Sequence, residues 1–176
     1  MADRRLEIIR GDITTLDVAV IVNAANEELK PGGGVCGAIH DAAGPGLAAE
    51  CAKVPGGCPT GEARFTNGYD LKARFVIHTV GPVWHGGDQG EAALLAQCYR
   101  RALGLLLGNN LTSIAFPAIS TGIYGFPVDL AATIAVQTVA DFIAGDDRLQ
   151  RVIFCCFGEQ SQMAHEAALA ALWGSH

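Results

Sequence analysis

The chain has 176 residues, of which half are hydrophobic and 17% are charged, so it can bury one sizeable core and is not disordered as a whole. Its formal net charge of −6 at pH 7 argues against a nucleic-acid backbone as partner, because that binding requires clustered Lys and Arg. There is no apolar run long enough for a signal peptide or a membrane span, and the six cysteines lack the paired spacing of a zinc site. We therefore expect one cytoplasmic, monomeric domain over residues 1–176, with reduced thiols, no metal and no membrane contact.

Apolar runs of strand length alternate with longer helical patterns along the chain. In chain order, the predicted elements are strands 6–10 and 18–22, helices from 35 or 36 to 43 and from 47 to 54, strands 63–66 and 74–80, helix 91–107, strand 113–119, helix 128–143, strand 151–157 and helix 160–173. Asn67-Gly68 is a favoured tight-turn dipeptide and is expected to join two of the strands. This alternation predicts an α/β fold, a three-layer sandwich around a mostly parallel sheet.

Two loops that follow predicted strands and lead into helices carry the strongest functional signal. Gly32-Gly33-Gly34 can adopt positive φ angles and present consecutive N–H groups beside a helix N-terminus, which suits a phosphate or pyrophosphate. The segment 120–125, STGIYG, repeats this arrangement after another strand. Ligands bind at the carboxyl ends of strands in open α/β sheets. The two loops are therefore expected to hold a diphosphate from opposite sides without a lysine.

Two common nucleotide-binding classes fit the sequence poorly. Gly32, Gly34 and Gly37 match the spacing of a dinucleotide fingerprint, but the glycines begin about ten residues after the strand, whereas the fingerprint follows its strand directly. The G-x-x-x-x-G-K-[ST] motif of P-loop NTPases is absent from the chain. A nicotinamide dehydrogenase and a P-loop NTPase are both disfavoured.

Three segments taken together resemble the macro domain, in its MacroD branch of ADP-ribosyl hydrolases. They are GDITTLDVAVIVNAANEELKPGGGVCGAIH at 11–40, PTGEARFTNGYDLKARFVIHTVGP at 59–82 and AFPAISTGIYG at 115–125. The resemblance extends from about residue 6 to 157. It implies a three-layer α/β/α sandwich around a mixed six-stranded sheet, with ADP-ribose in a cleft above the strand ends.

The resemblance also implies a role for individual residues. Asp12 would accept the adenine amino group with the Ile13 backbone beside it, and Asn26 would bind the distal ribose. Tyr124 would pack against the distal ribose and Phe157 would stack on adenine. The residues expected to wrap the phosphates and distal ribose are Gly33, Gly34, Val35, Cys36, Gly37, Ala38, Ile39, Ser120, Thr121, Gly122, Ile123 and Tyr124.

Structural roles are the alternative for several of these side chains. Tyr124 and Phe157 could be plain core aromatics. Asn23 is expected to satisfy loop backbone groups rather than to bind ligand, and Asn26 could do the same. His78, inside the run FVIHTV, is interpreted as a hydrogen-bonded core histidine or as one that supports a site residue from behind, rather than as a catalyst.

Cys36 departs from the family pattern, which has an aspartate at this position of the loop. In MacroD-like enzymes that aspartate is taken to activate or orient the attacking water. An ordinary thiol is mostly protonated at neutral pH and is a poor base, so hydrolysis should be slowed. Asn26 and His40 are retained as catalytic candidates. His40 lies one helical turn after Cys36, which allows a further hypothesis in which it activates Cys36 as a nucleophile.

Two functions from different classes follow. The first is a hydrolase, slowed by Cys36, that acts on mono-ADP-ribosyl esters of protein Asp and Glu and on O-acetyl-ADP-ribose without a metal or redox cofactor. The second is a module that reads free or protein-linked ADP-ribose without turnover. Other nucleotide-metabolite chemistry, such as processing of a cyclic phosphate, is the remaining alternative.

Overall fold

The computed structural model describes residues 3–174 and contains strands and helices in alternation. In chain order, the elements are β1 (Leu6–Arg10), the 3-10 helix η1 (Ile13–Thr15), β2 (Val20–Ala24), α1 (Gly34–Ala43), α2 (Pro45–Ala52), β3 (Ala63–Asn67), β4 (Phe75–Thr79), α3 (Glu91–Gly108), β5 (Ser113–Phe116), α4 (Val128–Ala144), β6 (Arg151–Cys156) and α5 (Glu159–Gly174). Within residues 3–174, no helix is long and apolar enough to cross a membrane.

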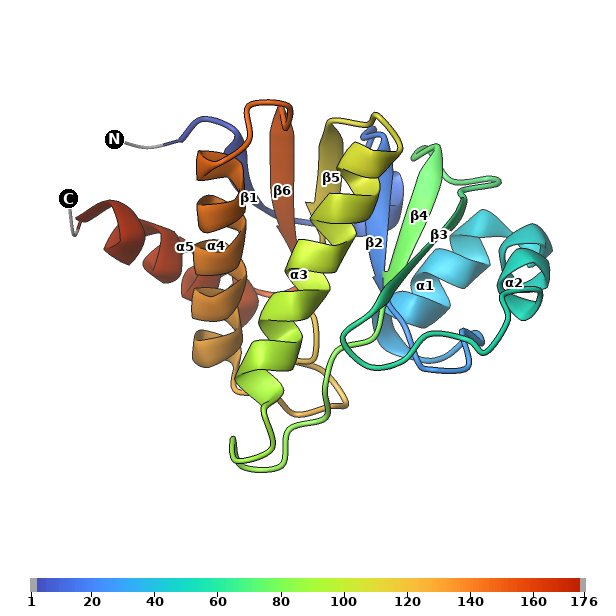
Figure 1. Ribbon diagram of the computed structural model, residues 1–176, viewed down its shortest axis with the longest axis horizontal. Helices are drawn as coiled ribbons and strands as arrows, with labels where there is room; N and C mark the ends of the chain where they lie inside the picture. The colour runs from blue at the N-terminus through green and yellow to red at the C-terminus, as the bar shows by residue number, and fades with distance from the viewer. Residues whose placement is uncertain (1–2, 175–176) are drawn as a thin grey trace.

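The strands form one six-stranded sheet in the order β1-β6-β5-β2-β4-β3. Neighbouring strands are parallel except β3 and β4, which pair antiparallel at one edge. Helices lie on both sides of the sheet (Figure 1). The predicted α/β sandwich with a mixed, mostly parallel six-stranded sheet is therefore confirmed.

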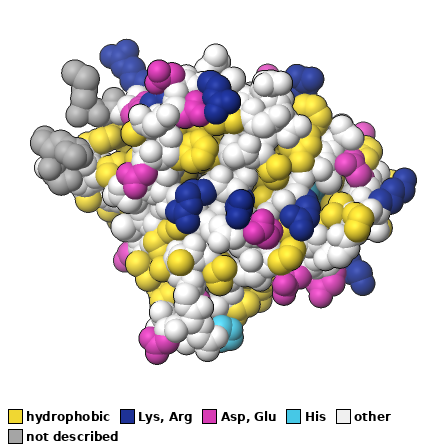
Figure 2. Space-filling view, viewed as in Figure 1, with side chains coloured by type: hydrophobic (Ala, Val, Ile, Leu, Met, Phe, Trp, Pro, Cys, Tyr) yellow, Lys and Arg dark blue, Asp and Glu magenta, His cyan; other side chains and the backbone are white. Residues whose placement is uncertain are grey.

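The central strand β2 shows why three layers form. Val20, Ile21 and Val22 are each 0% exposed, as expected for a β-branched strand covered on both faces. Val20 and Val22 belong to the core cluster beneath α3 and α4, whereas Ile21 belongs to the cluster beneath α1 and α2. Successive side chains of a strand point to opposite faces, so one apolar run serves both layers. On the outer surface over α3 and α4, charged side chains of both signs are spread among hydrophobic ones (Figure 2).

Two strands differ from the sequence expectation by two or more residues at an end. β2 begins and ends two residues later than predicted, so that Asn23 is a strand residue whose Cα is in register with that of His78. β5 ends at Phe116 rather than at residue 119. Pro117 follows directly and has no N–H to donate to the ladder, which accounts for the shorter strand.

The connection between β3 and β4 is a longer loop, and the expected tight turn at Asn67-Gly68 is wrong. β3 ends at Asn67 and β4 begins at Phe75. The Gly68 N–H donates to the Arg74 carbonyl over 2.8 Å and closes the loop at its base. The Tyr69 hydroxyl donates to Oε1 of Glu50 over 2.7 Å, so a contact with α2 holds the loop and replaces the local turn.

Candidate functional site

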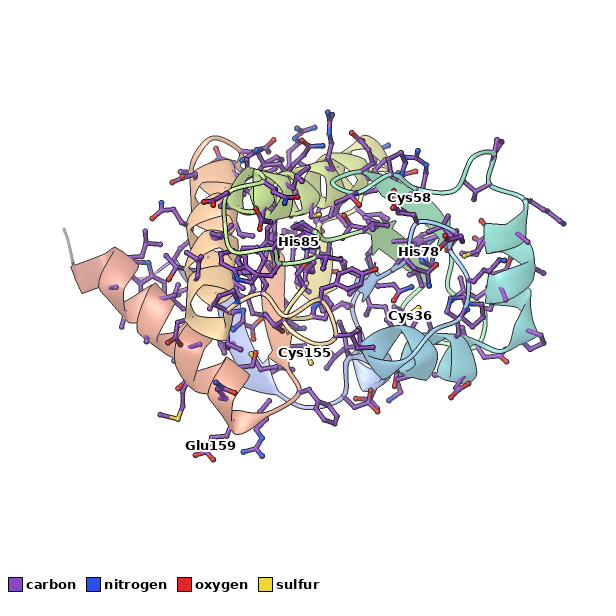
Figure 3. All side chains as sticks on the ribbon, turned by 90° about the horizontal axis from the view of Figure 1, so that it is seen from below. Cys36, Cys58, His78, His85, Cys155 and Glu159 are labelled. Atoms are coloured by element: carbon purple, nitrogen blue, oxygen red, sulfur yellow. The ribbon has the colours of Figure 1, made fainter. Side chains whose placement is uncertain are left out.

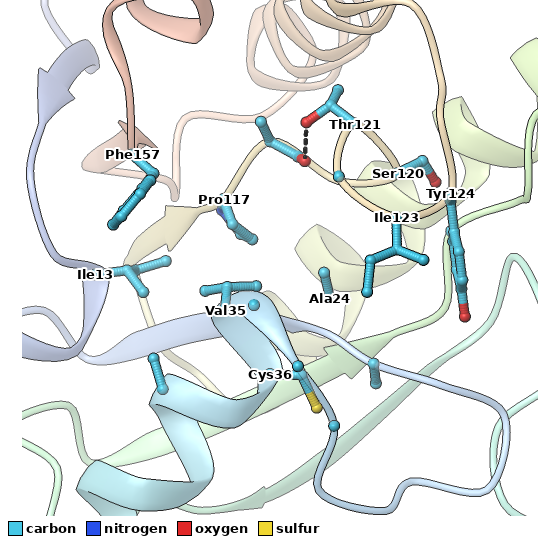
Figure 4. Close-up of a pocket in the computed structure, with 18 of the residues that line it drawn as sticks. Ile13, Ala24, Val35, Cys36, Pro117, Ser120, Thr121, Ile123, Tyr124 and Phe157 are labelled. Carbon is cyan, nitrogen blue, oxygen red and sulfur yellow. Dashed lines mark hydrogen bonds between the residues drawn. The ribbon is translucent and has the colours of Figure 1, made fainter.

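A cavity of about 670 Å³ lies at the carboxyl ends of the parallel strands, as expected for an open α/β sheet. The loops that follow β1, β2, β4, β5 and β6 all contribute to its wall. The residues expected at the ligand site that do line it are Asp12, Ile13, Asn26, Gly33, Gly34, Val35, Cys36, Ala38, Ser120, Thr121, Gly122, Ile123, Tyr124 and Phe157. Figure 4 shows the start of α1, with Val35 and Cys36, facing the loop that carries Ile123 and Tyr124.

The first glycine loop ends at the N-terminus of α1, where backbone donors are free. Gly33 is the N-cap and provides no side-chain cap, and the first turn contains no acidic residue. Gly34 has a φ of +57°, which glycine adopts readily. Within residues 3–174, the N–H groups of residues 34–36 have no backbone or side-chain acceptor. Unpaired N–H groups and the helix dipole together favour an anion at this point.

The second loop, residues 120–125, presents further free donors from the opposite side. The Phe126 N–H donates to the Ser120 carbonyl over 2.9 Å and the Gly125 N–H to the Gly122 carbonyl over 3.0 Å, so the loop is folded on itself. The N–H groups of residues 122–124 have no acceptor within residues 3–174. Ser120 has a φ of +68°, and such strain in a non-glycine residue is characteristic of functional loops.

The two loops approach each other across the cavity. Ile123 is 89% exposed, and a Cβ added at Gly33 would lie 3.9 Å from its Cδ1 atom. Gly81, after β4, lies under the second loop, where a Cβ would meet Oγ of Ser120 at 2.1 Å. Glycine at position 81 therefore lets β4 and the second loop pack closely.

One end of the cavity carries a carboxylate and an exposed ring. Oδ1 of Asp12 accepts the Thr14 N–H over 2.9 Å and the Thr14 hydroxyl over 2.7 Å, which caps η1 and leaves Oδ2 available. Phe157 is 93% exposed, so the alternative that it is a core aromatic is wrong.

Tyr124 is partly buried in the cavity wall, and burial together with the nearby Glu27 and Glu28 carboxylates raises its pKa.

Asn26 closes its own loop while it lines the cavity. Its Nδ2 donates to the Lys30 carbonyl over 2.8 Å and its Oδ1 accepts the Lys30 N–H over 2.9 Å. An amide side chain has two N–H groups and two acceptor lone pairs. One donor and one acceptor therefore remain for a ligand.

Cys36 belongs to a buried polar network that extends into the sheet. The thiol is 5% exposed, and its Sγ lies 3.7 Å from Nδ2 of Asn23 and 3.7 Å from the Lys30 carbonyl. Nδ2 of Asn23 also lies 3.1 Å from Nδ1 of His78. Burial lowers the pKa of His78 to about 3, with a smaller effect of His40, so the ring is neutral at neutral pH. His78 and Cys36 are labelled in Figure 3.

The tautomer of His78 follows from its neighbours. Nε2 of His78 lies 2.9 Å from Oγ1 of Thr66, and that hydroxyl donates to the Asn67 carbonyl. Nε2 therefore carries the proton and donates to Thr66, and Nδ1 accepts from Asn23. This arrangement turns the amide donor of Asn23 towards Cys36. The interpretation of His78 as a hydrogen-bonded core histidine is confirmed, but its link to position 36 could not be found from sequence spacing.

His40, Gly37 and Ile39 do not line the cavity. His40 is 7% exposed, and neither ring nitrogen has a hydrogen-bond partner within residues 3–174, so the expected pair with Cys36 is not formed. Burial lowers the pKa of His40, and its ring lines a separate depression of about 320 Å³. Ile39 is fully buried in the core, and Gly37 packs against the Gly32 carbonyl. A single helical face cannot direct residues 36–40 all into one cavity.

Sequence reasoning missed part of the cavity wall. The additional lining residues are Gly11, Ala24, Ala25, Gly81, Pro117, Ala118, Cys155 and Ser161, and Gly32 of the predicted glycine loop also lines the cavity. Most are small residues at strand ends. Their small side chains are the one sequence feature that could have indicated them, because they leave room for the cavity. Within the described residues, no group of three or more His, Cys, Asp or Glu side chains is placed to hold a metal ion.

Known proteins with the same sequence pattern and fold are numerous. The family model described as Macro domain matches residues 22–135. The O-acetyl-ADP-ribose deacetylase of Klebsiella pneumoniae is 56% identical over 168 residues, which cover 94% of this chain and 96% of the relative.

Solved structures agree with this match. The Oceanobacillus iheyensis macrodomain with ADP is 45% identical, with a TM-score of 0.93, and the match covers 97% of this chain and 93% of that one. The Trypanosoma brucei macrodomain in complex with ADP-ribose is 44% identical, with a TM-score of 0.89 over 94% of this chain and 69% of that one. The resemblance noted in the sequence is confirmed: this chain belongs to the macro domain family.

Proposed function

We propose that the cavity binds ADP-ribose and that the protein hydrolyses ADP-ribosyl esters. The observation that carries the proposal is the presence of two sets of free N–H groups, at residues 34–36 and 122–124, on the two loops that line opposite sides of the cavity. A diphosphate suits such donors because each N–H gains an anionic acceptor and the helix dipole favours the charge. A deacetylase among the relatives and ADP-ribose bound to a family member both support this ligand.

The rest of the ligand has complementary groups on either side of the diphosphate. Oδ2 of Asp12 is available to accept the adenine amino group, and the exposed Phe157 ring offers a face for stacking. At the other end, the spare donor and acceptor of Asn26 suit a ribose diol, and Tyr124 provides an apolar wall. The distal ribose would then lie beside Cys36.

The substrates that we propose are O-acetyl-ADP-ribose and mono-ADP-ribosyl esters of protein Asp and Glu. Water is added across the ester, which releases the free carboxylic acid and a ribose hydroxyl. A thiol is a weaker acceptor for the proton of water than a carboxylate, so rate enhancement must come mainly from orientation of the substrate by the two loops. A slow hydrolase is the expected result.

A module that reads ADP-ribose without turnover is the second candidate. It is favoured by the thiol at position 36, which leaves the distal end without a strong base. Binding by the diphosphate loops does not depend on this thiol.

The test begins with calorimetric titration of ADP-ribose, for which we expect saturable binding. The parent protein is then incubated with O-acetyl-ADP-ribose and with a protein carrying mono-ADP-ribose on Glu, and release is followed by mass spectrometry. Release of acid and ADP-ribose above the protein-free rate supports the hydrolase. Binding without release supports the reader, and absence of binding contradicts both.

A further inference from the structure

The carboxylate of Glu91 lies beneath an exposed turn outside the cavity. Glu91 is the first residue of α3 and is 1% exposed, although the turn formed by residues 85–90 is exposed. Its Oε2 accepts the N–H groups of His85 over 2.8 Å and of Gly87 over 2.9 Å, and its Oε1 accepts the N–H of Gln89 over 2.6 Å. These donors, that of His85 first, lower the pKa of Glu91 to about 2, so the group is ionised. One side chain thus organises the whole turn.

The turn of residues 85–90 packs against Trp84. Gly87 has a φ of +97°, and a Cβ there would lie 3.0 Å from Cη2 of Trp84, so the turn packs directly on the indole. The ring also contacts that of Phe126, at 4.7 Å between centroids and an angle of 54°. The ring is therefore packed between the 85–90 turn, which the Glu91 carboxylate holds, and Phe126 at the end of the second glycine loop.

Trp84 connects this support to the ligand cavity. Its backbone N–H donates to the Tyr124 carbonyl over 2.8 Å. Within residues 3–174, this is the one backbone-to-backbone hydrogen bond that ties residues 120–126 to a segment outside 118–126. The bonded carbonyl belongs to the peptide that joins Tyr124 to Gly125, so the bond holds the backbone directly after the tyrosine ring and the free N–H groups of residues 122–124. Loss of order at Trp84 would thus be transmitted to the cavity.

We propose that Glu91 is a positioning residue for the ligand cavity, acting through the 85–90 turn and Trp84 on the Tyr124 side of the second glycine loop. The inference rests on the proposed ADP-ribose site, because it concerns which part of that ligand the loop serves. The effect falls on the diphosphate and distal ribose. The Asp12 and Phe157 end of the cavity is built on β1 and β6 and does not depend on this support.

The test compares two ligands on the variant Glu91→Gln. Glutamine keeps the size of the side chain but places an NH₂ group against N–H donors, so the three bonds cannot all form. We expect the Kd for ADP-ribose to rise about tenfold, as for loss of a charged hydrogen bond, while the Kd for AMP measured by NMR titration stays within about twofold. The matched control is Asp129→Asn, which removes an exposed charge from the first turn of α4 and should change neither Kd.

A fluorescence readout follows Trp84 itself. In the background Trp173→Phe, Trp84 is the remaining tryptophan. We expect Glu91→Gln to shift its emission to longer wavelength and to increase quenching by acrylamide, because the turn no longer covers the ring. If Glu91→Gln fails to fold, as judged by circular dichroism, Glu91→Asp takes its place, since its shorter carboxylate cannot reach all three donors.

The outcomes separate clearly. A folded variant with unchanged ADP-ribose affinity, with unchanged Trp84 emission, or with equal losses for ADP-ribose and AMP overturns the positioning role. If the parent protein does not bind ADP-ribose, the proposed function fails, whereas the fluorescence change still tests whether Glu91 orders Trp84.

Discussion

Asn23 donates through Nδ2 to Nδ1 of His78 over 3.1 Å, and the same nitrogen lies 3.7 Å from Sγ of Cys36. A fully buried amide donor is thus directed at a thiol, which accepts hydrogen bonds only weakly. A carboxylate at this position would accept the same bond strongly and would gain from its charge. The Asn23 donor is therefore better suited to an ionised acid at position 36 than to a thiol, whereas the Lys30 carbonyl accepts from the thiol that is present.

Cys36→Asp should accelerate ester hydrolysis. A general base typically contributes about 10²- to 10⁴-fold, and the donor of Asn23 is in place to orient the carboxylate, so we expect the single-turnover rate to rise at least about tenfold. Release of ADP-ribose from a Glu-modified protein, followed by mass spectrometry, measures this rate. Cys36→Asn has the shape of the acid without its charge and should give no increase. Equal rates for both variants would show that position 36 does not act as the base.

Phe157→Ala should weaken ligand binding without affecting stability. The ring is 93% exposed, so its removal should change the free energy of unfolding by less than about 0.5 kcal/mol. Stacking of a base on an aromatic ring is worth about 1 to 3 kcal/mol, which corresponds to a rise of about 5- to 150-fold in the Kd for ADP-ribose measured by calorimetry. Met163→Ala removes another exposed apolar side chain away from the cavity and serves as the control. A wild-type Kd for Phe157→Ala would exclude stacking.

Gly81→Ala should damage both the fold and the second glycine loop. The added methyl group would lie 2.1 Å from Oγ of Ser120 and 2.6 Å from Cγ2 of Ile119, so the loop must move. Such overpacking costs about 1 to 3 kcal/mol, to be measured by urea unfolding, and the affinity for ADP-ribose should fall with it. Gly104→Ala, in the middle of α3 with open space around it, should instead be neutral or stabilising. Unchanged stability and affinity in Gly81→Ala would contradict the close packing.

His78 should make the fold sensitive to acid. Burial lowers its pKa to about 3 from the ordinary value of 6.5, so between these pH values the unfolded chain binds a proton that the folded chain does not. The free energy of unfolding should therefore fall as the pH decreases from about 6.5 towards 3, by up to about 1.4 kcal/mol per pH unit for this residue.

The measurement is urea unfolding of the parent and of His78→Gln at pH 7, 6, 5 and 4. The variant should show a shallower pH dependence of the free energy of unfolding, because it lacks the buried His78. His40 and His165, whose pKa values burial also lowers, remain in both proteins and should leave a residual slope. Identical slopes in the parent and His78→Gln would show that His78 is not buried as a neutral ring.

The layers and most of the cavity could be predicted from the sequence because local patterns determine them. The β-branched run at residues 20–22 requires burial on both faces, and glycines at strand ends require unusual backbone angles. Contacts between distant segments could not be predicted in this way. Helical spacing suggested a pair of His40 with Cys36, but the partner of Cys36 is Asn23, whose orientation depends on β2 lying beside β4.

The same limit applies to the supports of the loops. The Asn67-Gly68 dipeptide predicts a tight turn, but Glu50 of α2 holds Tyr69 and stabilises a longer loop. The role of Glu91 is hidden for the same reason, since its partners are backbone N–H groups that carry no side-chain signal. Propensity and periodicity describe a segment, whereas these contacts belong to the assembled fold.

The donors proposed for the diphosphate in the two glycine loops are peptide groups, and this has a consequence for how the site should respond to change. A lysine or arginine clamp can be removed by one substitution and is weakened by salt, but a peptide N–H remains with any side chain except that of proline. The φ and ψ angles of the two loops determine where these N–H groups point and so how well they bind the anion. Mutations and solution conditions should therefore act on this site through the shape of the backbone, and affinity for the diphosphate should track the rigidity of the loops more closely than their charge.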